Sequence, residues 1–135
     1  MARLQAPFIE RVESFCDRVV HVAVALGEKN ISRRIVDQVM ASGTSVGANT
    51  FEADEAMSRS DFTKCLSIAL KELNETRFWL RLAARHNWIP AKRLDALLTE
   101  LQEIRSIMGT MIARTKHKPA QPPTLFCLSF AALLL

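Results

Sequence analysis

The sequence contains little of what sheet proteins use. It has no tyrosine, only four glycines in 135 residues, and few runs of strand-like alternation. Sheets need strand-forming runs and frequent turns, so these shortages favour an all-α chain. Hydrophobic residues make up 49% of the sequence. A chain of this length can bury a core as a single domain without metals or disulfides.

Cysteine is also scarce. Cys16, Cys65 and Cys127 are an odd number with no paired spacing, which excludes a disulfide framework and a zinc site of the paired-cysteine kind. The first seven residues contain no apolar stretch of the kind that signal peptides carry. We therefore expect a protein of the reducing cytoplasm.

Apolar residues recur instead at alternating steps of three and four, the spacing typical of packed helices. This spacing predicts helices over about 8–27, 31–57, 60–87 and 90–116, with Gly27 ending the first and Pro90 beginning the fourth. The short connections favour antiparallel neighbours, so the fold predicted is an up-down-up-down four-helix bundle covering residues 1–118. On each predicted helix the apolar or small residues at this spacing form one line. The four lines are Phe8, Val12, Phe15, Val19, Val22, Leu26; Ile35, Val39, Ser42, Val46, Asn49, Ala53, Ala56; Phe62, Leu66, Ala69, Leu73, Thr76, Leu80, Ala83; and Leu94, Leu97, Leu101, Ile104, Met108, Met111.

Segment 42–49 is rich in small residues and contains Gly43 and Gly47, yet the helical spacing continues through it. A helix this slim indicates close approach by another helix. A second, partly apolar line runs along helix two and another along helix three, and each fits either a wide core face or a subunit interface. The second lines are Val36, Met40, Gly43, Gly47, Thr50 and Cys65, Ile68, Glu72, Glu75, Trp79, Leu82, His86.

Two glutamates on helix three, Glu72 and Glu75, fall on such a line and would need donors if buried. Asn49 and Ser45, with Thr50 nearby, are the candidates on helix two. We therefore predict a structural polar network of Asn49, Ser45, Glu72 and Glu75, which would fix the register of the two helices.

No arrangement for catalysis is evident. A di-iron bundle site needs Glu-x-x-His on two helices, and none exists in the sequence. Ser42, Ser45 and Cys65 have no neighbouring His and acid, and the glycines lack a phosphate-loop ending. We expect no catalytic residue, no metal, no cofactor and no enzyme activity.

Basic residues gather at one end of the predicted bundle. The net charge is +4 and the pI about 9.3. Each cation alone fits a solvated face with intrahelical ion pairs, but repeated around a ring they would form a positive rim that attracts phosphates. This basic pole holds Lys29, Arg33, Arg34, Arg77, Arg81, Arg85, Lys92 and Arg93 against Glu28, Asp37 and Asp95, while the opposite pole mixes Arg59, Lys64, Arg114, Lys116 and Lys118 with Glu10, Glu52, Asp54, Glu55 and Asp61.

Residues 119–135 follow the predicted bundle and comprise a proline-rich break and an apolar run over 125–135. Eleven residues are too few to span a bilayer, so no stable membrane span is expected. The run could fold back on the bundle, pair between subunits or insert shallowly into a membrane.

The joint pattern of helices two and three resembles the small bacterial bundle proteins encoded in intervening sequences of 23S rRNA genes, once described as S23 ribosomal proteins. The resemblance covers about residues 8–116. It implies an up-down bundle, a ring-like homopentamer and no catalytic residues. The residues that carry it are Gln38, 42–49, Glu52, Ala53, Ser60, Asp61, Phe62, 66–69, Glu72, Glu75, Thr76, Trp79 and Leu80.

A branch related to that family is the accessory variability determinant of diversity-generating retroelements, which is basic, binds nucleic acid and partners a reverse transcriptase. From this resemblance and the basic pole we expect a non-enzymatic, homo-oligomeric scaffold. It would bind RNA or DNA through the basic pole, beside a larger nucleic-acid enzyme such as a reverse transcriptase. The alternative is an oligomeric protein-interaction module with no nucleic-acid role, using its groove or tail.

Overall fold

Four helices make up the described part of the chain. The computed structural model describes residues 3–116, and the predicted tail 119–135 lies outside this range. Within it the chain is all-helical, as predicted. The helices are α1 (Ala6–Glu28), α2 (Arg33–Asp54), α3 (Arg59–Arg85) and α4 (Ala91–Lys116).

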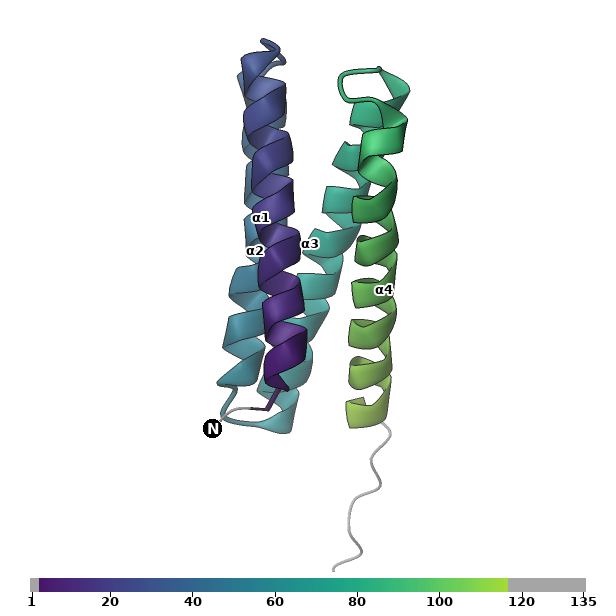
Figure 1. Cartoon of the computed structure of the whole chain (residues 1–135). Coiled ribbons are helices and arrows are strands. Elements are labelled where there is room, and N and C mark those ends of the chain that lie inside the picture. Colours follow the sequence, from purple (N-terminus) through teal and green to yellow (C-terminus); the bar gives the residue numbers. More distant parts are fainter. Residues whose placement is uncertain (1–2, 117–135) are drawn as a thin grey trace, which may run out of the picture.

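Successive helices run in alternating directions, so two connections lie at one end of the molecule and one connection lies at the other, with the start of α1 and the end of α4 (Figure 1). We call the end with the α1–α2 and α3–α4 connections the upper pole. The lower pole is the end with residues 3–5, the α2–α3 connection and the last turn of α4. α2 packs against both α1 and α3, whereas α4 packs mainly against α3.

Asparagines, rather than the expected glycine, shape the connections at the upper pole. Gly27 lies inside α1, and Asn30 and Asn87 carry the positive φ values, 56° and 54°. Asparagine adopts this left-handed conformation more readily than most residues. At the lower pole α2 ends at Asp54, before the predicted end at residue 57. The Ser58 side chain caps α3 by accepting the Asp61 N–H at 3.0 Å.

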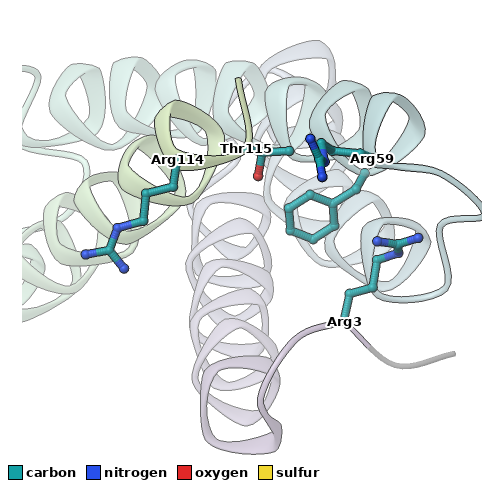
Figure 2. Close-up of a pocket in the computed structure, with 5 residues that line it drawn as sticks. Arg3, Arg59, Arg114 and Thr115 are labelled. Atoms are coloured by element: carbon teal, nitrogen blue, oxygen red, sulfur yellow. The ribbon is translucent and has the colours of Figure 1, made fainter. Parts of the chain in front are cut away.

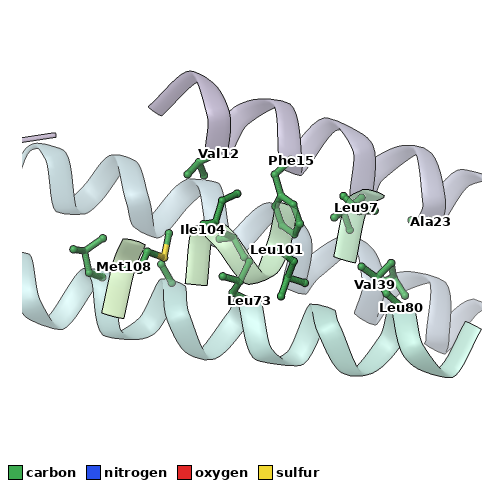
Figure 3. Close-up of a cluster of buried hydrophobic side chains, with 14 of the residues drawn as sticks. Val12, Phe15, Ala23, Val39, Leu73, Leu80, Leu97, Leu101, Ile104 and Met108 are labelled. Carbon is green, nitrogen blue, oxygen red and sulfur yellow. The ribbon is translucent and has the colours of Figure 1, made fainter. Parts of the chain in front are cut away.

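The core follows the four predicted lines, except that Ala23, Thr50 and Ile112 are buried where the lines placed their half-buried neighbours Val22, Asn49 and Met111. Its largest side chains are fully buried, and each helix contributes some of them (Figure 3). Burying one such side chain contributes about 1.5–3 kcal/mol, so the lines account for why these segments associate. Residues from all four helices in this core include Val12, Phe15, Val39, Leu73, Leu80, Leu101, Ile104 and Met108.

The two glycines of α2 lie against α1. A Cβ on Gly43 would come within 2.4 Å of Val19 Cγ1, and one on Gly47 within 3.0 Å of Cys16 Sγ. The Cys16 thiol donates to the Gly43 carbonyl at 3.1 Å, and burial raises its pKa to about 11. The close approach predicted from segment 42–49 is therefore a contact inside one chain, and the second line of α2 belongs to the core.

The second line of α3 differs from that of α2. Ile68 is 36% exposed, and Cys65, Glu72 and Trp79 are half-buried. Phe51 on α2 and Phe78 on α3 are also about half exposed, at 48% and 51%. The wide-core interpretation thus holds for α2, while on the second line of α3 Ile68 stays partly exposed.

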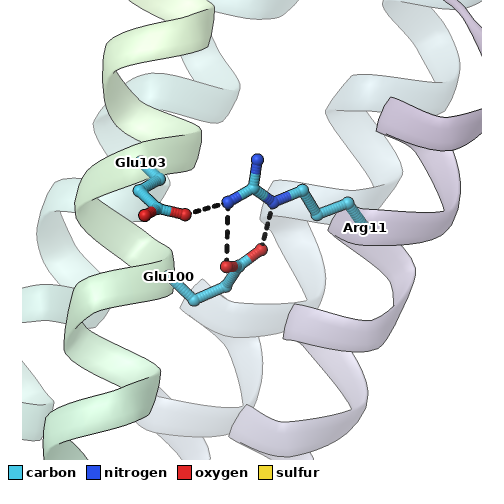
Figure 4. A network of polar contacts seen from close by, with 3 residues as sticks. All are labelled: Arg11, Glu100 and Glu103. Carbon is cyan, nitrogen blue, oxygen red and sulfur yellow. Dashed lines mark hydrogen bonds and ion pairs between the residues drawn. The ribbon is translucent and has the colours of Figure 1, made fainter.

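A charged cluster joins α1 to α4 (Figure 4). The Arg11 guanidinium donates to both oxygens of Glu100, at 2.5 and 3.0 Å, and also to Glu103. The Arg11 hydrogen bond and charge hold the pKa of Glu100 below its usual range. None of the four described helices is long and apolar enough to cross a bilayer.

Candidate nucleic-acid interface

The structure brings the eight cations of the predicted basic pole to the upper pole and the adjoining half of α3. Lys29 lies in the α1–α2 connection, Arg33 and Arg34 begin α2, and Lys92 and Arg93 lie in the first turn of α4. The other three, Arg77, Arg81 and Arg85, follow one another at i,i+4 spacing along the last turns of α3. All are exposed except Arg77, which is half-buried.

Some of these cations already have partners. Lys29 Nζ donates to the Trp88 carbonyl at 2.5 Å and so ties the two connections of the upper pole together. Arg33 Nε lies 4.0 Å from Asp37 Oδ2 one turn along α2, the limit of an ion pair, and both side chains are exposed. Such an exposed pair contributes little to stability, so Arg33 remains available to an anionic ligand.

The arginine row of α3 faces a hollow that carries both charges. Arg77 and Arg81 line one wall of this hollow of about 530 Å³, and Asp95 and Glu103 of α4 also line it. Phe78 lies beside the same row and packs edge to face on Trp79, with ring centroids 5.0 Å apart. A phosphate placed between α3 and α4 would therefore meet carboxylates as well as guanidinium groups.

Two aromatic residues near the upper pole, Phe78 and Trp88, lie in different surroundings. Trp88 is half-buried and stacks on His86, with ring centroids 5.1 Å apart. It fits a plug that closes the upper end of the core. Phe78 is the more exposed of the two candidates, so it is the better platform for a base.

At the lower pole Arg3, which the sequence did not single out, joins cations that the sequence placed among acids. Arg3, Arg59 and Arg114 line a hollow of about 500 Å³ together with Phe62 and Thr115 (Figure 2). Arg3 reaches this place because the Asp54 carboxylate accepts the N–H groups of Arg3 and Leu4, at 2.8 and 2.7 Å. No local sequence signal reports a contact 51 residues away along the chain.

The predicted polar network of α2 and α3 forms as two separate pairs. Asn49 donates its side-chain N–H to the Ser45 carbonyl of its own helix at 2.9 Å, and Glu72 lies beside Glu75. In residues 3–116 no hydrogen bond joins one pair to the other. The buried bond between the two helices is instead Thr76 Oγ1 to Ser42 Oγ, at 3.0 Å, on the first lines of both helices.

Glu72 and Glu75 are half-buried on the outer side of α3. Partial burial, together with the negative charge of Glu75, raises the pKa of Glu72. Glu75 accepts the indole N–H of Trp79 at 3.3 Å and holds that ring along the helix. The charged form of Glu72 is therefore disfavoured on the face that carries the exposed Ile68.

Comparison with known proteins identifies the family. The model of the 23S rRNA-intervening sequence protein family matches residues 8–110 of this chain. The chain belongs to this family. Its fold is also similar to a crystal structure from Bacteroides thetaiotaomicron VPI-5482, described as a protein of unknown function from the S23 ribosomal protein family.

The similarity to that S23-family structure extends over most of the bundle. The two chains share 34% identity with a TM-score of 0.74, and the match covers 78% of this chain and 97% of the other. No curated protein matches the chain. The relation to retroelement accessory proteins, predicted from sequence, stays a prediction.

Within the described part of this family member, no three His, Cys, Asp or Glu residues are arranged to hold a metal ion. The prediction of a non-enzymatic protein remains a prediction. The described features that can act on a ligand are therefore the cations of the two poles and the exposed face of α2 and α3.

Proposed function

We propose that this 23S rRNA-intervening sequence protein is a non-enzymatic scaffold that binds RNA or DNA through the upper pole. The observation that carries the proposal is the gathering of eight cations at and beside one end of the bundle, seven of them exposed. Each phosphate that a lysine or arginine neutralises releases counterions, and this release is the main source of sequence-independent affinity. Phosphates carry no base identity, so the binding proposed is independent of sequence.

The proposed scaffold is a homo-oligomer, with the pentamer as the state that the sequence resemblance implies. Exposed Phe51 on α2 and Ile68 on α3 support burial of these apolar side chains by a second copy. Around a ring the upper poles would form one positive rim, and affinity would rise with the number of phosphates contacted together. A larger nucleic-acid enzyme, such as a reverse transcriptase, is the partner proposed for this assembly.

A second function is supported by the exposed apolar side chains of α2 and α3. Phe51, Phe78 and Ile68 are the kinds of side chain that protein interfaces bury. On this alternative the oligomer is a protein-interaction module, and its cations serve solubility. The two functions differ in one measurable respect, because a protein-interaction module would not bind nucleic acid in a salt-dependent manner.

A salt titration tests the proposed function. We would measure fluorescence anisotropy of a labelled RNA and a labelled DNA with wild type and with Arg81→Gln/Arg85→Gln/Arg93→Gln. Glutamine keeps the helices, so melting should change little while affinity falls and the salt slope flattens. The control removes three cations between the poles, as Arg18→Gln/Lys71→Gln/Arg105→Gln, and should change the slope less. Absence of wild-type binding at low salt would favour the protein-interaction module.

A further inference from the structure

The lower pole contains two adjoining hollows whose described linings are basic and contain no carboxylate. The first is lined by Arg3, Arg59, Phe62, Arg114 and Thr115. The second, of about 610 Å³, shares Arg59 and Thr115 with the first. It adds Lys64 and Lys116 to the cations, and Ser60 and Thr63 to the hydroxyl groups. This is the reverse of the α3–α4 hollow, which two acids line.

Two of the acids near this pole, Asp54 and Asp61, have roles within the fold. Asp54 is only 9% exposed, and its carboxylate is occupied by the N–H groups of Arg3 and Leu4. Asp61 lies in the first turn of α3, where a negative charge complements the helix dipole. Among the described residues no ion pair involves Arg59, Arg114, Lys64 or Lys116. Their charge is therefore available to a ligand.

Arg3 is held in place before any ligand arrives. Its Nε donates to the Ala56 carbonyl at 2.8 Å, and its backbone N–H bonds to Asp54. These contacts leave the two terminal nitrogens of the guanidinium group for an anion. Arg59 extends beside Thr115, whereas the Arg114 guanidinium extends away to the other side (Figure 2). A positioned arginine loses less side-chain freedom on binding than a free one.

The first turn of α3 adds further donors to the shared wall. Arg59 and Ser60 are the first two residues of a 27-residue helix, and the leading N–H groups of a helix have no acceptor within it. The positive end of the helix dipole therefore lies at the wall that Arg59 and Ser60 form. Thr115 and Thr63 donate their hydroxyl protons to carbonyls of their own helices, so the cations and these N–H groups are the donors toward an anion.

We propose that the two lower-pole hollows bind a terminal polyphosphate, with one phosphate in each hollow and Arg59 between them. An internal phosphodiester carries one negative charge per phosphate. Five cations in two adjoining hollows supply more positive charge than such a group needs, so they suit a ligand with more negative charge. Arginine forks match phosphate oxygens in pairs and suit such a group. A free nucleoside triphosphate and the 5′-triphosphate end of an RNA present this same chemistry.

This site is separate from the proposed nucleic-acid surface, so the two can fail independently. We would measure binding of pyrophosphate and of orthophosphate to the full-length protein by calorimetry at low salt. Pyrophosphate should bind more tightly than orthophosphate, because it fills both hollows. The variant Arg59→Gln/Arg114→Gln should weaken pyrophosphate binding by roughly tenfold or more, whereas Arg81→Gln/Arg85→Gln at the upper pole should leave it within about twofold.

Two further arms identify the source of the phosphate and guard against a folding artefact. A 5′-triphosphate RNA and its 5′-hydroxyl counterpart are compared with a free nucleoside triphosphate, each with wild type and Arg59→Gln/Arg114→Gln. If a ligand binds more tightly because it carries the triphosphate, and Arg59→Gln/Arg114→Gln loses this gain in affinity, the site is supported with that ligand as the source of the phosphate. Lys64→Gln/Lys116→Gln, which changes two exposed side chains only, should also weaken pyrophosphate binding. Equal binding of pyrophosphate and orthophosphate, or equal losses in lower-pole and upper-pole variants, would overturn the proposal.

Discussion

The upper pole has eight basic side chains and the described lower pole has five, and the two poles use them differently. At the upper pole the cations are spread over four helix ends, Lys29 is tied to the Trp88 carbonyl, and the α3 arginines face Asp95 and Glu103. At the lower pole the Asp54 carboxylate is occupied by backbone N–H groups, and the cations line hollows in which the described lining residues include no acid. The upper pole is thus a broad basic surface, and the lower pole is a compact site.

The difference shows that counting charges by pole is a poor guide to anion binding. The sequence placed five acids beside the lower-pole cations, which predicted a pole of mixed charge. Whether the pole can bind an anion depends on whether each carboxylate is free to neutralise a neighbouring cation. Asp54 is not, because it accepts two N–H groups of the segment before α1.

The largest expected effect concerns the close contact between α1 and α2, two helices that run from one pole to the other. A Cβ on Gly43 would overlap Val19, whereas one on Gly109 of α4 would meet nothing within 4 Å. Gly43→Ala and Gly109→Ala gain the same helix preference, so their difference isolates overpacking, about 1–3 kcal/mol against Gly43→Ala. Urea midpoints measure it, and adding Val19→Ala should recover part of the loss. Equal midpoints would show that the helices separate without cost.

The next effect sharpens the contrast by disabling one pole only. Asp54→Ala leaves the N–H groups of Arg3 and Leu4 without their carboxylate, and the segment before α1 should detach. We expect a loss of roughly 1–2 kcal/mol in thermal or urea unfolding, because a chain end can partly rehydrate. Pyrophosphate binding should fall while the salt slope for nucleic acid stays the same. A loss at both poles would mean that they are not independent.

A smaller effect concerns Arg11, which ties α1 to α4, the helix with cations at both poles. The pKa of Glu100 is lowered in the folded state, so this pair stabilises the fold above the unfolded pKa of about 4.3 and loses its effect as pH falls through the lower folded value. The groups are partly exposed, so Arg11→Gln should cost less than about 1 kcal/mol at pH 7. Denaturation at several pH values should show that the difference in stability between wild type and Arg11→Gln disappears in acid. A difference that persists in acid would indicate that Arg11 stabilises the fold by packing rather than by charge.

The smallest effect lies between the poles, on the outer side of α3. The pKa of Glu72 is raised in the folded state, so as pH rises the unfolded chain ionises first and the charge then disfavours folding. Glu72→Gln should therefore be neutral or slightly stabilising at pH 7, within about 0.5 kcal/mol, with no gain at pH 3. Parallel urea titrations decide this. A loss above about 1 kcal/mol would restore the buried network predicted from sequence.

The fold could be read from the sequence because alternating steps of three and four fix which side of each helix is buried. Val12, Leu73 and Leu101 lie where that spacing placed them. Finer features were out of reach. The spacing does not fix helix rotation closely enough to choose between Ser45–Glu72 and Ser42–Thr76 as the polar contact. The attachment of Arg3 to Asp54 depends on a contact between distant parts of the chain, which local patterns do not report.

The most direct test of the upper pole as the nucleic-acid surface compares both poles on one strand. Anisotropy of a 5′-hydroxyl RNA is followed over a salt series with wild type, with Arg81→Gln/Arg85→Gln/Arg93→Gln, and with Arg59→Gln/Arg114→Gln/Lys116→Gln. Each lost phosphate contact lowers the slope of log affinity against log salt by about 1. We predict a slope reduced by about 2–3 for the upper-pole variant and little change for the lower-pole variant. A larger reduction for the lower-pole variant would contradict the assignment of the nucleic-acid surface to the upper pole.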